Sequence, residues 1–184
     1  MIILDKYLKY RNIATVLLAL FAFCAGSAAE EASPQGVKLG IDVLIESNFE
    51  QVSGKRIALL TNNTGRSQSG DLTVEILLKS NKCTVVSLLT PEHGFWTTIP
   101  AGESVKSHEL FGLPAYSLYG DNRRPTRSQL ADIDAVVVDF QDIGIRSYTY
   151  ISTMFKVMSA CAEYGIPVVV LDRPNPLGGE IVDG

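Results

Sequence analysis

The sequence has little of what most metal and cofactor sites require. Its 184 residues include two histidines and three cysteines, and no two cysteines have the short spacing of a zinc site. The G-x-G-x-x-G turn and the Walker A loop of nucleotide sites are missing, as is the G-x-S-x-G elbow of serine hydrolases. Acidic residues could hold a hard cation, but no stretch resembles a loop dedicated to one. We therefore expect no metal and no cofactor.

A basic surface for nucleic acid is also lacking. The formal net charge is -4, and lysine and arginine form no cluster along the chain, so we expect no nucleic-acid partner. Hydrophobic residues make up 46% of the chain and charged residues 20%, which is an ordinary globular composition. The length suits one domain with a short additional segment.

The first residues differ in character from the rest. Three positive charges precede an uncharged apolar segment at 13–23, which is shorter than the roughly 20 residues that span a bilayer. Small residues follow at 27–29. This order predicts a signal peptide over 1–29, a linker over 30–37, and an exported domain, periplasmic or secreted, with no membrane span after cleavage. An uncleaved membrane anchor is the alternative.

Signal cleavage would leave two cysteines, Cys83 and Cys161. An exported location permits a disulfide between them, but no spacing pattern indicates a disulfide framework. We therefore predict two free thiols, one on a strand and one on a helix, each buried as a small hydrophobic side chain.

Apolar runs alternate with helical patterns over residues 38–184. The runs predict buried strands at 55–61, 83–89, 135–140 and 167–171, and the helical patterns predict helices at 38–51, from a capping Asp71 to 79, at 128–131 and at 148–164. Such alternation is typical of a parallel sheet covered on both faces. We predict an α/β domain with a Rossmann-like parallel sheet and helices on both faces. The stretch from 90 to 127 is expected to be mostly loop, with a functional or lid role.

Polar residues follow each predicted strand directly. They are Thr61, Asn62, Asn63 and Thr64 after the first strand, Glu92 and His93 after the second, Asp139, Gln141, Asp142 and Arg146 after the third, and Asp172, Arg173 and Asn175 after the fourth. The carboxyl ends of parallel strands lie at one edge, where open α/β sheets bind their ligands. We therefore expect these side chains to form one polar site.

Glu92 is the strongest candidate for a catalytic residue. It follows a strand and neighbours Phe95 and Trp96, whose rings could stack on a sugar. A carboxyl group in an apolar, aromatic cleft has a raised pKa and can act as a general acid near neutral pH. The alternative is a solvated loop acid or a helix cap, and the adjacent His93 could equally bond the loop backbone.

Other candidates also have structural alternatives. Ion pairs could join Asp142 to Arg146 and Asp172 to Arg173, and Arg123 and Arg124 could simply be solvated. Tyr148 and Tyr150 lie two residues apart at a predicted helix start. They cannot share one helix face, so we expect one to face the site and the other to pack.

Five segments, taken in order, resemble one family. They are TNNTG at 61–65, PEHGF at 91–95, LPAYSLYG at 113–120 with RRPT at 123–126, DFQDIGIRSYTYISTM at 139–154, and VVVLDRPNPLGG at 168–179. Together they resemble the exo-β-N-acetylmuramidase family, formerly a domain of unknown function, over about 40–184. The resemblance implies a Rossmann-like N-terminal domain, a smaller C-terminal domain, and an active site in the cleft between them.

The resemblance also implies an activity, the exo-acting release of β-linked N-acetylmuramic acid (MurNAc) from the non-reducing ends of peptidoglycan fragments. The partners would be muropeptides or MurNAc-GlcNAc, and the family's acid/base, the glutamate of PEHG, is Glu92 here. We expect His93 and Asp142 to assist it, although Asp139, a tyrosine or the substrate's acetamido group could supply the second catalytic group. Retaining and inverting schemes both stay open.

The other polar residues would bind the sugar. They are Asn62, Asn63, Thr64, Arg124, Asp139, Gln141, Arg146, Tyr148, Tyr150, Asp172, Arg173 and Asn175. By the same resemblance, one of Arg123, Arg124, Arg146 and Arg173 would pair with the lactyl carboxylate of muramic acid, since arginine forms strong bidentate bonds with carboxylates.

The sequence departs from the family pattern in two places and in length. Asn63 replaces the histidine of TNHTG, and Trp96-Thr97 replaces the Arg-Gly that usually follows PEHGF. Members resembling this chain continue well beyond LDRPNPLGG, so we expect a truncated protein without the family's C-terminal domain. A non-catalytic muropeptide-binding module and an inactive fragment are the alternatives.

Overall fold

The computed structural model describes residues 36–103 and 107–180, and Val37–Gly184 form one compact unit. The predicted signal peptide, 1–29, and most of the predicted linker lie outside the described residues and stay predictions. Within the described ranges, no helix has the length and apolar character needed to cross a membrane.

A six-stranded sheet forms the centre of this unit. The strands are β1 (Arg56–Thr61), β2 (Thr84–Thr90), β3 (His108–Leu110), β4 (Leu113–Ser117), β5 (Ala135–Asp139) and β6 (Val168–Val170). Their order is β3-β4-β2-β1-β5-β6, and all neighbours are parallel except the antiparallel pair β3 and β4. The predicted α/β fold with a mainly parallel sheet is confirmed.

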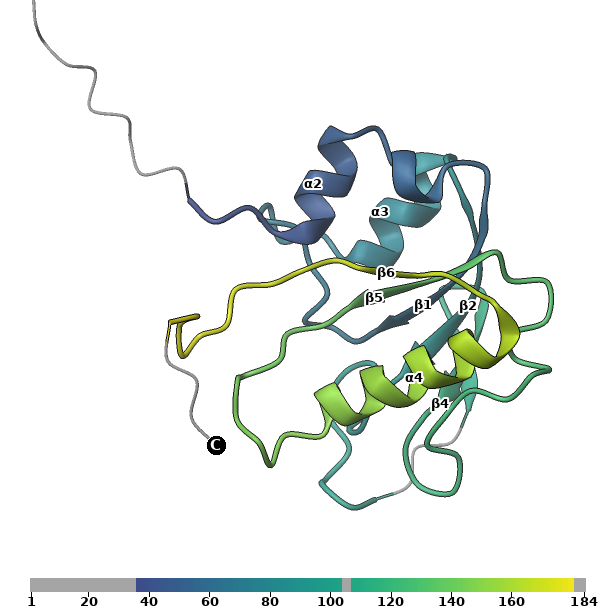
Figure 1. Cartoon of the computed structure of the whole chain (residues 1–184), viewed down its shortest axis with the longest axis vertical. Coiled ribbons are helices and arrows are strands. Elements are labelled where there is room, and N and C mark those ends of the chain that lie inside the picture. Colours follow the sequence, from purple (N-terminus) through teal and green to yellow (C-terminus); the bar gives the residue numbers. More distant parts are fainter. Residues whose placement is uncertain (1–35, 104–106, 181–184) are drawn as a thin grey trace, which may run out of the picture. The chain divides into compact units, whose positions relative to one another are not determined.

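Helices cover both faces of the sheet (Figure 1). The short α2 (Gly40–Glu46) and α3 (Thr73–Ser80) pack on one face, and α4 (Tyr150–Tyr164) packs on the other. Side chains along β1 alternate accordingly, because successive residues of a strand point to opposite faces. Ile57 and Leu59 pack with α2 and α3, whereas Ala58 and Leu60 pack with α4. Burial on both faces explains why the central strands are continuously apolar.

The long helix α4 is held by one apolar stripe. Its buried residues are Tyr150, Thr153 and Val157, followed by the adjacent pair Ala160 and Cys161, which lie three and four residues after Val157. This spacing places all five on a single helix face. The helix ends at Gly165, which adopts a left-handed conformation with φ of 68°. Glycine tolerates this conformation at a helix end, so the predicted cap is confirmed.

Two helix predictions in the first half of the domain were wrong. Asp71 does not cap a helix, since α3 begins after Leu72 and the Asp71 carboxylate instead accepts a hydrogen bond from Ser69. The helix predicted at 38–51 is broken, because Asn48 and Phe49 adopt positive φ. A single 3-10 turn, η1 (Glu50–Val52), follows the break.

The stretch predicted as loop contains a hairpin. β3 and β4 are joined by Phe111 and Gly112, both at positive φ, as in the tight turns that match the twist of two strands. β3 is short and mostly exposed, so it lacks the apolar run by which strands are found in a sequence. Further on, residues 128–131 form turns rather than the predicted helix.

Cys83 and Cys161 are free, as predicted, but Cys83 directly precedes β2 and is only half-buried, whereas the prediction was a buried thiol on a strand. Cys83 packs against the core on the α2 and α3 side of the sheet, whereas Cys161 is buried on the α4 side. The sheet therefore separates the two thiols. Burial raises the pKa of the Cys161 thiol to about 11, which keeps it protonated and unreactive.

Candidate active site at the carboxyl edge of the sheet

Successive strands of the chain are added first on one side of β1 and then, from β5 onward, on its other side. β2 lies on one side of β1 and β5 lies on the other, and such a reversal opens a crevice at the carboxyl ends of the strands. Thr61 and Asp139 are paired at this point, and the Thr61 hydroxyl donates to the Asp139 carbonyl at 2.6 Å. A Cβ at Gly65 would lie 2.4 Å from Thr61 Oγ1 and 2.7 Å from that carbonyl, so only glycine permits this approach.

Glu92 lies at this edge, after β2, and is 6% exposed. Its Oε1 accepts the Gly102 backbone N–H at 3.2 Å, and its Oε2 accepts the Thr149 hydroxyl at 2.7 Å. The Tyr119 hydroxyl also donates to this carboxylate. The three donors come from three separate segments, and sequence reasoning identified none of them as site residues.

This environment changes the expected chemistry of Glu92. Burial by itself raises the pKa of the carboxyl, but the hydrogen bonds from Thr149, Tyr119 and Gly102 outweigh it, and the pKa lies below its ordinary value. Hydrogen bonds to the charged form favour ionisation. The predicted raised pKa was therefore wrong for the free protein, and Glu92 is a carboxylate at neutral pH.

The neighbouring aromatic residues pack with one another. Phe95 is buried, with its ring centroid 4.9 Å from that of Trp96 and 5.2 Å from that of Phe111. Trp96 is 48% exposed, so part of its ring is available to a ligand.

His93 bonds the backbone of its own loop, which is the structural alternative to a catalytic contact. Its Nδ1 lies 2.7 Å from the Ile99 carbonyl of the same loop, and its backbone is left-handed, with φ of 70°. The imidazole thus shapes the loop that carries Glu92. The electrostatic influence of His93 is a further, smaller reason for the lowered pKa of that carboxyl.

Asn62 joins three segments beneath the site. This fully buried side chain donates from Nδ2 to the Tyr150 hydroxyl at 2.8 Å, and its Oδ1 accepts both the backbone N–H and the hydroxyl of Thr64. The Thr64 hydroxyl in turn accepts the Gln141 backbone N–H at 2.8 Å. A buried network in which each polar group is bonded fixes its neighbours rigidly.

The two tyrosines lie in contact with each other, and Tyr150 is the one that packs in the core. Tyr150 is buried, and burial together with Tyr148 raises its pKa. The ring centroids of Tyr148 and Tyr150 lie 4.4 Å apart. The helix α4 begins at Tyr150 and not at the predicted residue 148, so Tyr148 precedes the helix and packs against the Tyr150 ring. The role of Tyr148 in facing the site stays a prediction.

Asp139 and Arg173 form a buried ion pair. Arg173 Nε donates to Asp139 Oδ1 at 2.6 Å and Nη2 to Oδ2 at 3.1 Å, and the Thr73 hydroxyl also donates to Oδ2. Arg173 further donates to the Arg66 carbonyl at 2.7 Å. Burial raises the pKa of Asp139, and the guanidinium opposes that rise. The pair fastens the loop after β6 to the end of β5. By contrast, the Asp172 carboxylate accepts the Arg173 backbone N–H at 2.9 Å, and the Asp172 carbonyl accepts the Gly40 backbone N–H at 2.7 Å.

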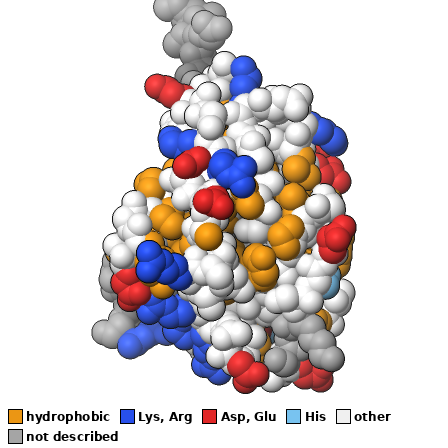
Figure 2. Space-filling model, turned by 90° about the vertical axis from the view of Figure 1, so that its right-hand side faces the viewer, with side chains coloured by type: hydrophobic (Ala, Val, Ile, Leu, Met, Phe, Trp, Pro, Cys, Tyr) orange, Lys and Arg blue, Asp and Glu red, His pale blue; other side chains and the backbone are white. Residues whose placement is uncertain are grey.

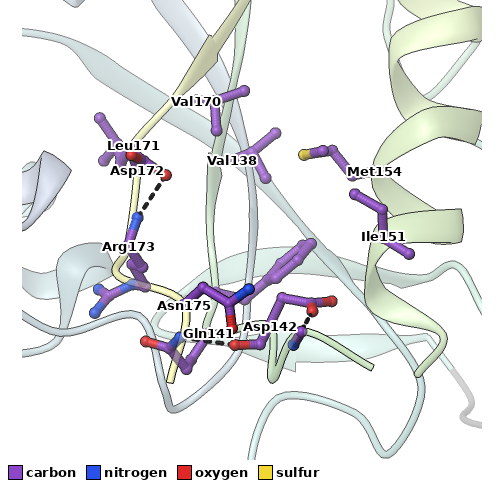
Figure 3. A pocket seen from close by; sticks show the side chains of 12 residues that line it. Val138, Gln141, Asp142, Ile151, Met154, Val170, Leu171, Asp172, Arg173 and Asn175 are labelled. Carbon is purple, nitrogen blue, oxygen red and sulfur yellow. Dashed lines mark hydrogen bonds between the residues drawn. The ribbon is translucent and has the colours of Figure 1, made fainter. Parts of the chain in front are cut away.

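A separate cavity of about 230 Å³ lies between α4 and β6 (Figure 3). Asp142, Gln141, Arg173 and Asn175 contribute polar groups to it, and Glu92 is not among its lining residues. Gln141 donates to the carbonyls of Asp142 and Pro174, and Asn175 accepts the Leu177 backbone N–H.

Within this cavity, one of the two carboxylate oxygens of Asp142 accepts a hydrogen bond from a described residue and the other does not. Its Oδ1 accepts the Gly144 backbone N–H at 2.8 Å, while its buried Oδ2 has no partner among the described residues. Arg146 is exposed, and no ion pair joins it to Asp142 in the described part of the chain.

Arg124 does not join the other candidates. It pairs with Glu163 at 2.6 Å, near the end of α4, whereas Thr149, which bonds Glu92, precedes the start of that helix. On the face seen in Figure 2, basic and acidic side chains are interspersed around a band of hydrophobic ones. No cluster of three or more potential metal ligands lies within the described ranges.

Comparison with known proteins decides the family. A sequence model described as "Exo-beta-N-acetylmuramidase NamZ, N-terminal" matches residues 57–184. The chain belongs to this family. It is 41% identical over 177 residues to the peptidoglycan beta-N-acetylmuramidase NamZ of Bacillus subtilis (strain 168), covering 92% of this chain and 43% of the relative.

Two solved structures of DUF1343 family proteins from Bacteroides fragilis NCTC 9343 are also similar. One is 48% identical with a TM-score of 0.72, over 80% of this chain and 37% of that one. The other is 34% identical with a TM-score of 0.61, over 76% of this chain and 35% of that one. The chain thus spans about two-fifths of the length of its NamZ-family relatives, and the predicted resemblance is confirmed.

The buried pair predicts a large loss of stability on substitution of Arg173. Arg173→Ala should lower the free energy of unfolding by about 3–5 kcal/mol, because Asp139 is left as an uncompensated buried charge. Urea denaturation measures this change. Arg124→Ala, which removes an exposed pair, is the matched control and should leave the midpoint nearly unchanged; equal losses in the two variants would contradict a structural role for the buried pair.

The bonds around Glu92 predict a change in its titration. Thr149→Val keeps the side-chain shape but removes one donor to the carboxylate, so the pKa of Glu92 should rise. Titration of 13C-labelled glutamate side chains by NMR, assigned with Glu92→Gln, measures this pKa. Thr149→Ser restores the hydroxyl and should restore the original value. A Thr149→Val curve that coincides with that of the unmodified protein would show that Thr149 does not tune Glu92.

Proposed function

We propose that this chain carries the acid/base residue of an exo-acting glycoside hydrolase that releases β-linked MurNAc from the non-reducing ends of peptidoglycan fragments, in cell-wall turnover and recycling. The observation that carries the proposal is the Glu92 carboxylate, buried and fixed by three donors at the carboxyl edge of the sheet. The family membership and the named activity of the Bacillus subtilis relative support it. An exported location, which such a substrate requires, is part of the proposal.

In the proposed mechanism, Glu92 protonates the leaving glycosidic oxygen as an oxocarbenium-like transition state forms. The free carboxyl is ionised because its hydrogen bonds lower its pKa, so it must gain a proton when the sugar is bound. A sugar that excludes water from the crevice raises the pKa of the carboxyl through desolvation. Asp142, proposed as the second group, has one unpartnered oxygen but lines the separate cavity between α4 and β6, so this role requires a sugar that reaches that cavity as well as Glu92.

The exposed part of Trp96 offers a flat apolar surface for one face of the sugar ring. Such amphipathic aromatic rings suit ligands that present both apolar and polar surface.

The structure favours Arg123 as the partner of the lactyl carboxylate. Arg173 is committed to Asp139, and Arg124 to Glu163. Arg123 lies over the ring of Tyr119, 5.7 Å from its centroid. Because the Tyr119 hydroxyl bonds Glu92, this guanidinium is the one tied most directly to the proposed catalytic carboxylate.

A second candidate function is muropeptide binding without turnover. The specific observation in its favour is the lowered pKa of Glu92, which leaves the free protein without a proton on its proposed acid. Binding alone would need only the crevice, the exposed tryptophan and a free arginine.

The catalytic proposal predicts the effect of Glu92→Gln on hydrolysis of a chromogenic MurNAc β-glycoside. The rate should fall by about 10²–10⁴-fold, because general acid catalysis contributes that much. Glu109→Gln, an exposed carboxylate on β3, is the control and should keep the full rate. Undiminished release by Glu92→Gln would reject the role of Glu92. Binding of MurNAc by calorimetry, with no release from the unmodified chain, would favour the second candidate.

The assignment of Arg123 predicts a selective loss of affinity. Arg123→Ala should weaken binding of MurNAc by about tenfold or more, the usual contribution of a hydrogen bond between charged groups, and leave binding of N-acetylglucosamine unchanged. Arg124→Ala should affect neither sugar. Calorimetric titration of each variant gives the two dissociation constants. An equal loss for both sugars would mean that Arg123 does not recognise the lactyl group.

A further inference from the structure

One end of the cavity between α4 and β6 is polar (Figure 3). Gln141 and Asp142 reach it from the loop after β5, and Asn175 reaches it from the loop after β6. The two loops lie close together, because a Cβ built at Gly144 would be 2.2 Å from Asn175 Oδ1. They therefore form one polar surface.

Two groups on this surface have hydrogen-bonding capacity that the protein does not use. The buried Oδ2 of Asp142 has no partner among the described residues. Asn175 Oδ1 accepts the Leu177 backbone N–H, whereas the Asn175 Nδ2 donates to none of the residues that the structure describes. Because a buried polar atom without a partner is costly, the surface offers an acceptor that requires a donor, beside a donor that is free.

The remaining wall of the cavity is apolar. Ile151 and Met154 line it from α4, and Val138 and Val170 line it from the strands (Figure 3). Ile151 is 38% exposed and Val170 47%, so the cavity opens to solvent between α4 and β6. Its volume of about 230 Å³ is far above the roughly 15 Å³ that admits one water molecule. The cavity can therefore hold a whole substituent of a ligand.

These walls define the chemistry of that substituent. It needs an N–H for Asp142, a carbonyl oxygen for Asn175 Nδ2, and an apolar end for the side chains of α4. An acetamido group, –NH–CO–CH₃, combines all three. An ammonium group would satisfy the Asp142 carboxylate alone, and the Arg173 guanidinium in the same wall is a like charge that disfavours it.

The start of α4 connects this cavity with the proposed catalytic carboxylate. Thr149, directly before the helix, donates to Glu92 Oε2, and Ile151, two residues later, lines the cavity. Glu92 follows β2 and Asp142 follows β5, so both lie at the carboxyl edge of the sheet. In a 2-acetamido sugar, the acetamido group is on the carbon next to the anomeric carbon. One sugar ring therefore carries both groups that these two sites would bind.

We propose that the cavity between α4 and β6 is an acetamido pocket. Asp142 accepts the acetamido N–H, Asn175 Nδ2 donates to the acetamido carbonyl, and Ile151 and Met154 contact the methyl group. Asp142 is then a specificity-determining residue that fixes the acetamido group beside the anomeric carbon. The inference rests on the proposed function for its ligand, a β-linked N-acetyl sugar, but its test measures binding and not hydrolysis.

The test compares sugars that differ only at C2. The ligands are the methyl β-glycosides of N-acetylglucosamine, 2-deoxyglucose and glucosamine, each titrated calorimetrically into the full chain. We expect the N-acetyl sugar to bind about tenfold or more tightly than either of the others, the usual contribution of a hydrogen bond to a charged group.

Asp142→Asn gives a second readout. It replaces the unpartnered oxygen by an N–H donor, so it should weaken binding of the N-acetyl sugar by about tenfold or more and leave the 2-deoxy sugar unaffected. The Tm of the free variant should stay equal or rise, because a buried charge without a full set of partners is removed. A merely structural Asp142 would instead lower the Tm and affect all sugars alike. Asp132→Asn, at an exposed position before β5, is the matched control and should change neither quantity.

The acetamido pocket is refuted if the three sugars bind alike or not at all, or if Asp142→Asn keeps the preference for the N-acetyl sugar. Tightest binding of glucosamine would also overturn it, because the cavity would then take an ammonium group. Hydrolysis of the chromogenic glycoside separates this inference from the proposed function. A chain that prefers the N-acetyl sugar without hydrolysing that substrate retains the pocket and loses the proposed activity, and hydrolysis without the preference has the opposite meaning.

Discussion

The bidentate contact between Asp139 and Arg173 is the constraint on which the carboxyl edge of the sheet depends. It joins the end of β5 to the loop after β6, and the same guanidinium reaches the Arg66 carbonyl in the loop after β1. Removing both charges from water is costly, and only a nearly complete set of hydrogen bonds compensates for that cost. Here Thr73 completes the set from the start of α3. Four segments are thereby held in one arrangement before any ligand arrives.

This constraint divides the polar residues at the edge into two groups. Asp139, Arg173 and Asn62 are buried and bonded to protein groups, so they build the floor of the crevice and have little capacity left for a sugar. Glu92 is held by its donors yet borders the more open loop with the exposed Trp96. Residues of both groups directly follow a strand, so their position in the sequence cannot tell the two groups apart. That position fixes where the backbone lies but not which groups the side chain contacts.

The sequence therefore predicted the strands and their common polar edge better than the side-chain contacts at that edge. Continuous apolar runs identified β1, β2 and β5, since burial on both faces imposes that composition, and also the edge strand β6, but the internal strand β4 was missed. The meeting of the polar strand ends at one edge followed from the parallel arrangement. The partners of Glu92 could not be found in this way, because Gly102 and Tyr119 come from long loops and Thr149 precedes a helix. Thr149 could have been recognised as a candidate, since the hydroxyl of a threonine directly before a helix usually takes part in a hydrogen bond.

The two departures from the family's sequence pattern are in contact with each other. Asn63 Nδ2 donates to the Trp96 carbonyl, and the Thr97 hydroxyl donates to Asn63 Oδ1. The backbone N–H of Asn63 also donates to the Phe95 carbonyl at 2.7 Å. The loop after β1 and the loop that carries the proposed acid are therefore joined directly at these positions.

The place of Thr149 at the start of α4 links a charge to a helix. Threonine at this position commonly caps the first turn with its own hydroxyl, but here that hydroxyl bonds Glu92 and makes no cap. The carboxylate therefore lies at the positive end of a 15-residue helix, where the aligned peptide dipoles favour a negative charge. When Glu92 gains a proton, the first turn of α4 loses its nearby anion. Protonation of Glu92 should therefore weaken the first turn of α4, and an ordered first turn should favour the ionised carboxylate.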